Sequence, residues 1–196
     1  MDLQKFCSTD SIRININKPF SKGEYTYATD GRIMVRVSKI EGIGEQEKSD
    51  KFKPVNPEPI FAAVSASVYI SLPDIPELKY EKCVKCDGTG EVKVCPECDG
   101  YGVVYFNTRY NEYECYCESC GGMGSTTGSD ETCSKCFGTG KIYKREWSIV
   151  AGQAYDHRFL LLLKDLPNCV IAETKDLKPG HFKFEGGDGL LMPMKI

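Results

Sequence analysis

The sequence has no long apolar run and only two histidines. The longest strongly apolar run, Phe159 to Leu163, is far too short to span a bilayer. The first ten residues contain no apolar core of the kind found in signal peptides. We therefore expect a soluble protein that has no membrane segment and is located in the cytoplasm. There thiols stay reduced, and cysteine pairs bind metal rather than form disulfides.

The usual catalytic motifs are also missing. There is no GxSxG, no P-loop and no HExxH. His157 and His181 are expected to be helix-start or strand residues rather than catalysts. Thiol–disulfide exchange through a CxxC pair is the one enzyme-like alternative, and zinc-bound thiolates are poor candidates for it. We therefore predict that the protein is not an enzyme.

Positive charge is not in excess either. The chain has 25 lysines and arginines against 28 acidic residues, for a formal net charge of −3. Proteins that bind nucleic acid usually carry a basic surface, because they neutralise phosphates. Charge therefore disfavours nucleic acid as a partner.

Cysteine, in contrast, is abundant, with 11 residues. Eight of them belong to a C-x-x-C-x-G-x-G phrase that occurs four times: CVKCDGTG (83–90), CPECDGYG (95–102), CESCGGMG (117–124) and CSKCFGTG (133–140). Two cysteines three positions apart can bind one tetrahedral metal ion, and two such pairs complete a four-sulfur site. The glycines allow the positive φ and close backbone approach that a metal knuckle needs. The sequence therefore predicts two closed, structural Zn²⁺ sites.

The spacing of the repeats does not decide how they pair. Nested pairing joins the first repeat to the fourth and the second to the third, as in an arm whose chain runs out and returns antiparallel. Sequential pairing joins the first to the second and the third to the fourth, and the linkers are long enough for it.

The four repeats closely resemble the DnaJ-type cysteine-rich zinc finger of heat-shock co-chaperones, over about 60 of the 196 residues. The resemblance implies nested pairing. It assigns one ion to Cys83, Cys86, Cys133 and Cys136, and the second to Cys95, Cys98, Cys117 and Cys120. Such co-chaperones stimulate an ATPase through a separate domain with a His-Pro-Asp tripeptide, which is absent here. The resemblance thus implies a polypeptide-holding arm without control of an ATPase.

Three cysteines lie outside the repeats. Cys7 and Cys169 are expected to be buried or half-buried thiols. Cys115 lies two residues before Cys117, so strand alternation would place both on one face. A role for Cys115 as a spare or exchanging ligand is an alternative.

The segment between the second and third repeats is rich in aromatic and β-branched residues. It predicts a β-hairpin, Val103 to Tyr116, with a turn at Asn107-Thr108-Arg109. A two-stranded arm has no deep core, so some of its rings are exposed or covered by a partner. The alternative is that they pack across the strands and on the zinc knuckles. The candidate partner-binding residues are Tyr101, Tyr105, Phe106, Tyr110, Tyr113 and Tyr116.

The residues before the repeats predict strands and one helix. Alternating apolar residues predict strands at Ser11–Asn17, Glu24–Thr29 and Arg32–Val37, the last two joined by a turn at Asp30-Gly31. The start Asn56-Pro57-Glu58 predicts an amphipathic helix that runs to about Tyr69.

The residues after the repeats predict a second helix among strands. Asp156 is expected to cap a helix with an apolar face of Phe159, Leu162, Leu163 and Leu166. The predicted strands are Lys141–Val150, Val170–Thr174, His181–Phe184 and Leu190–Ile196, with a turn at 186–189.

Neither flank alone has enough apolar surface for a stable unit, but together they contain about 135 residues. We therefore predict one discontinuous α+β domain, residues 1–80 and 141–196, with two helices and a mostly antiparallel sheet. An extended β-hairpin zinc arm, residues 81–140, interrupts it. The phrases ATDGRIMVRV, HRFLLLLKDLP and GDGLLMPMKI resemble one subdomain of a bacterial DNA polymerase sliding clamp. This resemblance bears on the fold of the flanks and not on activity.

Two functions are compatible with these features. The first is a zinc-stabilised protein-interaction module, chaperone-like or adaptor-like, that binds polypeptide through the aromatic hairpin. The alternative is an accessory protein of DNA replication or repair with a clamp-like domain and a zinc arm. Charge favours the first and the fold resemblance favours the second; the natural partner and the oligomeric state stay open.

Overall fold

The computed structural model describes residues 1–9, 13–46, 53–64, 68–128, 130–175 and 177–196. The chain folds into two compact units, which we describe separately. The flanking unit consists of Met1–Glu77 and Arg145–Ile196, and the cysteine-rich unit of Leu78–Lys144. The described chain is mostly β, with antiparallel sheets and two α-helices. The predicted α+β class is therefore confirmed.

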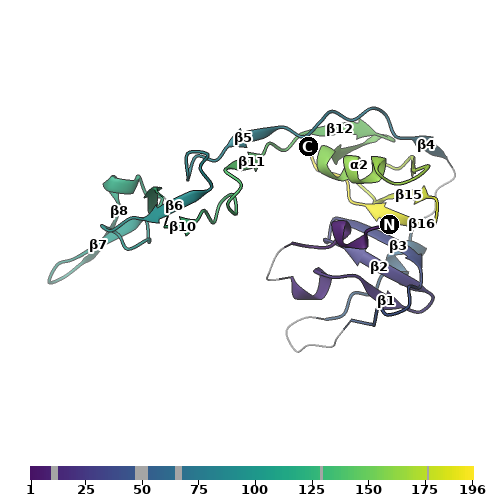
Figure 1. Cartoon of the computed structure of the whole chain (residues 1–196), viewed down its shortest axis with the longest axis horizontal. Helices are drawn as coiled ribbons and strands as arrows, with labels where there is room; N and C mark the ends of the chain where they lie inside the picture. The colour runs from purple at the N-terminus through teal and green to yellow at the C-terminus, as the bar shows by residue number, and fades with distance from the viewer. Residues whose placement is uncertain (10–12, 47–52, 65–67, 129, 176) are drawn as a thin grey trace. The chain divides into compact units, whose positions relative to one another are not determined.

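The flanking unit is built on one seven-stranded sheet (Figure 1). Its strands, in spatial order, are β1 (Phe20–Lys22), β2 (Tyr25–Thr29), β3 (Ile33–Ser38), β16 (Gly187–Leu191), β15 (Gly180–Phe184), β14 (Val170–Ala172) and β4 (Tyr69–Ser71). Every neighbouring pair is antiparallel. The pairing of β3 with β16 joins the two flanks, which confirms the mostly antiparallel sheet expected for them.

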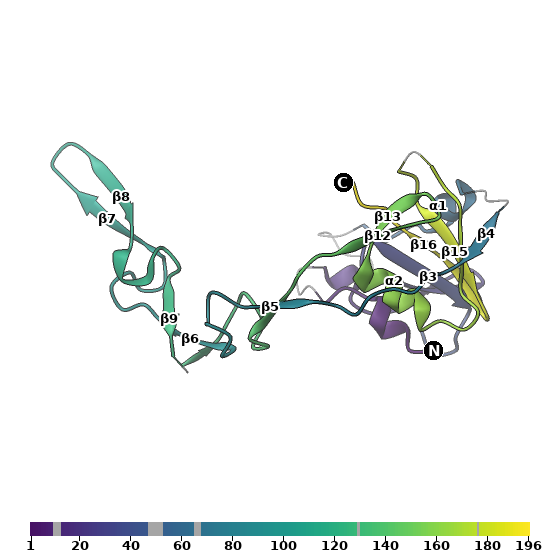
Figure 2. The same cartoon turned by 90° about the horizontal axis from the view of Figure 1, so that it is seen from above.

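The first face of this sheet carries the larger core. Ile33 and Val35 alternate onto it from β3 and are fully buried. They pack with α2 (His157–Lys164) and the 3-10 helix Leu3–Phe6, and Figure 2 shows α2 lying against the sheet. Burying one such aliphatic side chain contributes about 1.5–3 kcal/mol, so this face supplies most of the unit's stability.

Helix α2 begins where the sequence predicts. The Asp156 carboxylate accepts a hydrogen bond of 2.9 Å from the Arg158 amide, which confirms the cap. Its buried face differs from the expected one, because Leu160 is fully buried and Leu162 only partly. The second face of the sheet holds a smaller core of Phe20, Tyr27, Met34, Phe61 and Leu190.

Two predictions before the repeats are wrong. Ile14–Ile16 form a short 3-10 helix rather than a strand; Ile16 is buried and Ile14 half exposed. The rest of that predicted strand includes residues 10–12, which lie outside the described residues. A period of two over so few residues does not separate a strand from a 3-10 turn, whose period is three.

The helix predicted from Asn56 to Tyr69 is shorter in the structure. Helix α1 spans Glu58–Ala62, and Tyr69 begins strand β4; residues 65–67 are not described. The backbone of β4 pairs with β14, so tertiary pairing overrides the helical pattern. Asn56 does not cap α1. Its side-chain oxygen accepts from Lys22 Nζ at 2.5 Å instead.

The predicted strand Lys141–Val150 is two strands. Strand β11 (Lys141–Tyr143) pairs with β5 (Tyr80–Lys82), and β12 (Trp147–Val150) pairs with β13 (Gln153–Asp156), which the sequence did not predict. All four residues of β13 are buried, so it lacks the alternation that would reveal it.

The predicted turn at 186–189 is also misplaced. Gly187 and Gly189 lie in β16, which therefore begins three residues before the predicted Leu190 and ends at Leu191. A Cβ on Gly189 would meet the ring of Phe182 at 2.2 Å, and one on Gly187 would meet the ring of Phe184 at 2.7 Å. These glycines make room for core rings rather than form a turn.

The cysteine-rich unit contains short antiparallel strands (Figures 1 and 2). Besides β5 with β11, its strands are β6 (Glu91–Val94), β7 (Val103–Asn107), β8 (Glu112–Tyr116), β9 (Ser125–Thr127) and β10 (Glu131–Thr132), and Glu118–Cys120 form a 3-10 helix. Strand β6 lies between β10 and β9, and β7 pairs with β8. Its buried residues form two clusters that consist mainly of cysteine. Over the described ranges, no helix has the length and apolarity needed to cross a membrane.

Candidate metal centres

The structure gathers the sulfur atoms of the four repeats into two sets. The outer set consists of Cys83, Cys86, Cys133 and Cys136, and the inner set of Cys95, Cys98, Cys117 and Cys120. Within each set all four sulfur atoms lie within 4.8 Å of one another, and all eight cysteines are buried.

The sulfur–sulfur distances identify the kind of bond these sets can form. Two distances in the outer set are 3.9 Å (Cys83–Cys133) and 3.6 Å (Cys86–Cys136). A tetrahedron with Zn–S bonds of about 2.3 Å places its sulfur atoms about 3.8 Å apart, whereas a disulfide needs about 2.05 Å. The chain therefore has two sites positioned to hold Zn²⁺. Four sulfurs close each site, so no position is left for a reacting water.

Backbone hydrogen bonds join the same repeats that share a sulfur set. In the outer pair, the Cys83 amide donates to the Gly140 carbonyl at 2.9 Å, and the Cys133 amide donates to the Gly90 carbonyl at 2.9 Å. In the inner pair, Cys95 donates to Gly124 at 3.1 Å and Cys117 to Gly102 at 2.9 Å. In each pair, the first cysteine of one repeat donates a backbone hydrogen bond to the last glycine of the other, and the reverse bond is also formed. The spacing left nested and sequential pairing open, and the folded chain has the nested arrangement.

The second glycine of a repeat lies against its partner's backbone. A Cβ on Gly102 would lie 2.3 Å from the Gly122 carbonyl oxygen, and one on Gly124 would lie 2.2 Å from the Gly100 oxygen. No side chain fits there without moving the backbone. The amides of these glycines also donate to sulfur, as Gly102 does to Cys98 Sγ at 3.3 Å.

These hydrogen bonds favour a thiolate in each set. Burial alone would raise the pKa of Cys86, but hydrogen bonds from the Gly90 amide and the neighbouring thiols outweigh it and lower the pKa to about 6. The same causes, with the Gly124 amide, lower the pKa of Cys120 to about 7. Thiolates are the form that binds metal, so a thiol with a lowered pKa in each set favours the uptake of Zn²⁺.

Comparison with known proteins agrees with this geometry. The chain is 34% identical over 72 residues to the chaperone protein DnaJ of Francisella philomiragia, and 33% identical over 78 residues to that of Haloferax mediterranei. Each match covers 35% of this chain, but only 19% and 20% of the relatives. The cysteine-rich unit is a DnaJ-type zinc-finger region. No family model matches the chain, and no solved structure matches it; the resemblance of the flanks to a sliding clamp stays a prediction.

The three remaining cysteines lie outside both sulfur sets. Cys115 of the DnaJ-type region is exposed on β8, opposite Val104. Strand β8 ends at Tyr116, so the alternation that would place Cys115 beside Cys117 does not extend that far. Burial raises the pKa of Cys7 to about 11 and that of Cys169 to about 12. Both are protonated, buried or half-buried thiols, as expected.

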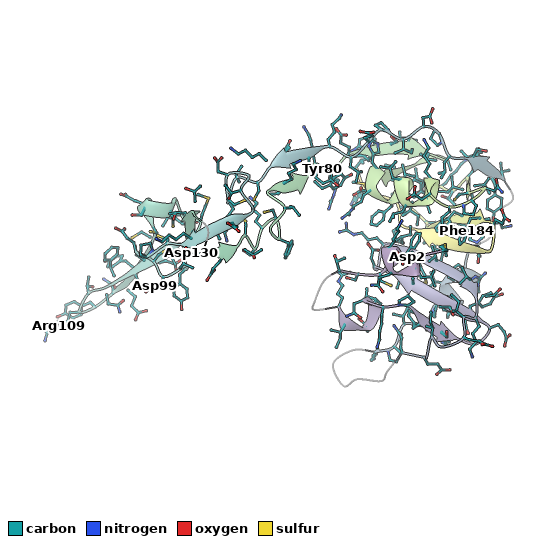
Figure 3. The ribbon with its side chains drawn as sticks, in the orientation of Figure 1. Asp2, Tyr80, Asp99, Arg109, Asp130 and Phe184 are labelled. Carbon is teal, nitrogen blue, oxygen red and sulfur yellow. The ribbon has the colours of Figure 1, made fainter. Side chains whose placement is uncertain are left out.

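The DnaJ-type region exposes every predicted partner-binding ring. Strands β7 and β8 form the predicted hairpin, although its loop is Thr108–Asn111 rather than Asn107–Arg109; Figure 3 labels Arg109 in that loop. The six rings are between 53% and 84% exposed: Tyr101, Tyr105, Phe106, Tyr110, Tyr113 and Tyr116. The partner-binding role of these rings stays a prediction.

Neither histidine belongs to the DnaJ-type region. His157 is the buried first residue of α2, and its Nε2 lies 2.7 Å from Ser148 Oγ. His181 lies in β15. Its Nε2 donates to Asp188 at 2.7 Å, because a carboxylate can only accept, and its Nδ1 lies 2.6 Å from the Tyr69 hydroxyl oxygen. Both positions are the helix-start and strand sites expected from the sequence.

Asp188 connects His181 to a further charge that the sequence did not reveal. Arg36 Nε and Nη2 donate to the two Asp188 oxygens at 2.6 and 2.9 Å. Burial alone would raise the pKa of Asp188, but hydrogen bonds from His181 and Arg36 together hold it below 3.8. This network spans β3, β16 and β15 and stabilises the sheet. From the sequence, the network is indicated only by a polar residue, Asp188, at a half-buried position of a strand.

Proposed function

We propose that this chain is a non-enzymatic, zinc-stabilised, chaperone-like module that binds polypeptide through the β7–β8 hairpin of its DnaJ-type region. Two Zn²⁺ ions would be held by the outer and inner sulfur sets, within an arm of residues 81–140 inserted in a domain of residues 1–80 and 141–196. The observation that carries the proposal is the exposure of six aromatic rings on and beside one two-stranded hairpin.

Zinc makes such a surface stable. The hairpin's buried neighbours are the four cysteines of the inner set, against which Val104 packs. A unit with so small a core cannot offset the conformational entropy of ordering its chain. A structural Zn²⁺ site supplies about 10 kcal/mol or more at neutral pH. The metal would therefore hold exposed rings in a fixed arrangement that apolar packing alone would not support.

The rings supply a large share of the free energy that polypeptide binding needs. Burying one of them against a partner contributes about 1.5–3 kcal/mol from apolar area. Two or three rings would then contribute about 3–9 kcal/mol, against about 8 kcal/mol for a micromolar complex, so backbone and ionic contacts must offset the cost of association. The proteins named DnaJ that match this chain are chaperones, which supports polypeptide as the partner.

The charge near the rings selects the kind of polypeptide. Residues 95–124 contain one base, Arg109, and the following acids: Glu97, Asp99, Glu112, Glu114 and Glu118. Four thiolates on one Zn²⁺ add two further negative charges. This half of the region repels phosphate and favours basic segments. The alternative function, an accessory protein of DNA replication or repair, predicts binding to DNA. The binding test therefore compares DNA with polypeptide.

The test measures anisotropy of a fluorescent, permanently unfolded polypeptide titrated with the zinc-loaded chain in the absence of ATP. We expect micromolar binding by wild type and a loss of at least about tenfold in the variant Tyr105→Ala with Tyr110→Ala. Phe137→Ala is the matched control, because Phe137 is 84% exposed in the same region but lies outside the hairpin. Equal binding by all three proteins, or a preference for DNA over polypeptide at physiological salt, would contradict the proposal.

A further inference from the structure

The strand register divides the hairpin's side chains between two faces. Directly opposite residues share a face, and successive residues alternate. One face, which we call the apolar face, carries two opposite pairs: Val104 with Cys115, and Phe106 with Tyr113. The other, which we call the acidic face, carries three: Val103 with Tyr116, Tyr105 with Glu114, and Asn107 with Glu112.

The two faces differ in chemistry. The apolar face has no charged residue and continues onto the inner sulfur set, against which Val104 packs. Phe106 and Tyr113 remain more than half exposed on it. The acidic face places Glu112 and Glu114 beside exposed tyrosine rings, and a ring face attracts a cation as a carboxylate does. One face therefore suits aliphatic side chains, and the other suits lysine or arginine.

The hairpin also has open edges. Among the strands that the structure describes, β7 and β8 pair only with each other. Each strand thus keeps one edge whose backbone N–H and C=O groups make no ladder bond. An extended peptide that adds to such an edge gains backbone hydrogen bonds and presents successive side chains to opposite faces.

We infer that the hairpin binds an extended polypeptide segment as a third strand, and that it selects segments whose side chains alternate between apolar and basic. This inference rests on the proposed function and specifies its ligand. The apolar side chains of the segment extend the apolar face beside Phe106 and Tyr113. Its lysines or arginines lie on the acidic face, which also carries Glu112, Glu114 and Tyr105.

Two capped peptides of identical composition test the inference against the full, zinc-loaded chain. One alternates four lysines with four valines, and the other has four lysines followed by four valines. We expect the alternating peptide to bind about tenfold more tightly, since only it pairs correctly with both faces. The change Glu112→Gln with Glu114→Gln should abolish that preference without changing zinc content. Phe106→Ala should weaken binding of the alternating peptide, whereas Phe137→Ala should not.

The possible failures are distinguishable. If both peptides bind equally and binding still requires Tyr105 and Tyr110, strand addition is wrong and the proposed function survives. A preference that persists in the double glutamine variant would likewise overturn the role of the acidic face. If neither peptide nor any unfolded polypeptide binds, both the inference and the proposed function fail.

Discussion

The interlocked glycines allow a demanding test of the repeat pairing. Gly102 and Gly121 both belong to the inner pair of repeats, and both have positive φ, of 75° and 58°. A Cβ on Gly102 would lie 2.3 Å from the Gly122 carbonyl oxygen, whereas one on Gly121 would meet nothing within 4 Å. The two positions share a positive φ and differ in the space available to a side chain.

The expected cost of each alanine follows from these contacts. The left-handed conformation costs a non-glycine residue about 1–2 kcal/mol, and this is all that Gly121→Ala should lose. Gly102→Ala must also displace the Gly122 carbonyl. That movement disturbs the Cys117 N–H to Gly102 bond of 2.9 Å and the Gly102 N–H to Cys98 Sγ bond of 3.3 Å. At about 1 kcal/mol for each bond, Gly102→Ala should lose about 2 kcal/mol more than the control.

Competition with a chromophoric chelator measures the difference. A further 2 kcal/mol corresponds to a Zn²⁺ affinity at the inner site about thirtyfold weaker than in Gly121→Ala. The outer site should be unchanged in both variants, because it lies in other repeats. If Gly102→Ala and Gly121→Ala bound the inner ion equally well, the close approach between the second and third repeats would be wrong.

Three other predictions concern the pairing, a strained residue and acid stability. Cys83→Ser should release the ion shared with Cys133 and Cys136 and leave one Zn²⁺ per chain by elemental analysis; release of the ion at Cys95 and Cys98 instead would indicate sequential pairing. Phe137 has a φ of 52° and an exposed ring, and Asn adopts a positive φ more readily than Phe. Phe137→Asn should therefore raise the chelator concentration at which the outer ion is lost, by an amount equivalent to about 1 kcal/mol; no gain would show that the ring makes a stabilising contact. Folding lowers the pKa of Asp188, so its contribution to stability is present above 3.8 and disappears as the pH falls through the lowered value. Urea unfolding of the flanking unit should therefore lose stability below about pH 4, and Asp188→Asn should be less stable at neutral pH and depend less on pH over that range; an unchanged acid profile in the variant would exclude this role.

The metal sites were the most predictable part of the molecule. Each C-x-x-C-x-G-x-G phrase forms its own turn, so the identity of the cysteines follows from a few neighbouring residues. The pairing was not predictable from spacing, because it depends on bonds such as Cys83 N–H to Gly140, between residues far apart in the chain. The resemblance to the DnaJ-type finger supplied what spacing did not.

Predictions for the flanking unit succeeded where a regular pattern coincided with burial. Ile33 and Val35 alternate in a strand with one buried core face, and Asp156 caps a helix through a local bond. The buried strand β13 has no alternation of apolar and polar residues, so its sequence does not indicate a strand. The glycines of β16 suggest a turn from sequence, but in the structure they make room for the rings of Phe182 and Phe184. Arg36 and Asp188 meet across two strands that are distant in sequence, so no local pattern predicts their ion pair.

In the proposed function, zinc holds a polypeptide-binding hairpin in place. One titration tests this directly: binding of the unfolded polypeptide is measured with the zinc-loaded chain, after removal of metal by a chelator, and after return of two equivalents of Zn²⁺. We expect binding to be lost on chelation and to recover with zinc, while the helical signal of the flanking unit persists throughout. Binding that continues unchanged in the metal-free chain would contradict the proposed role of zinc.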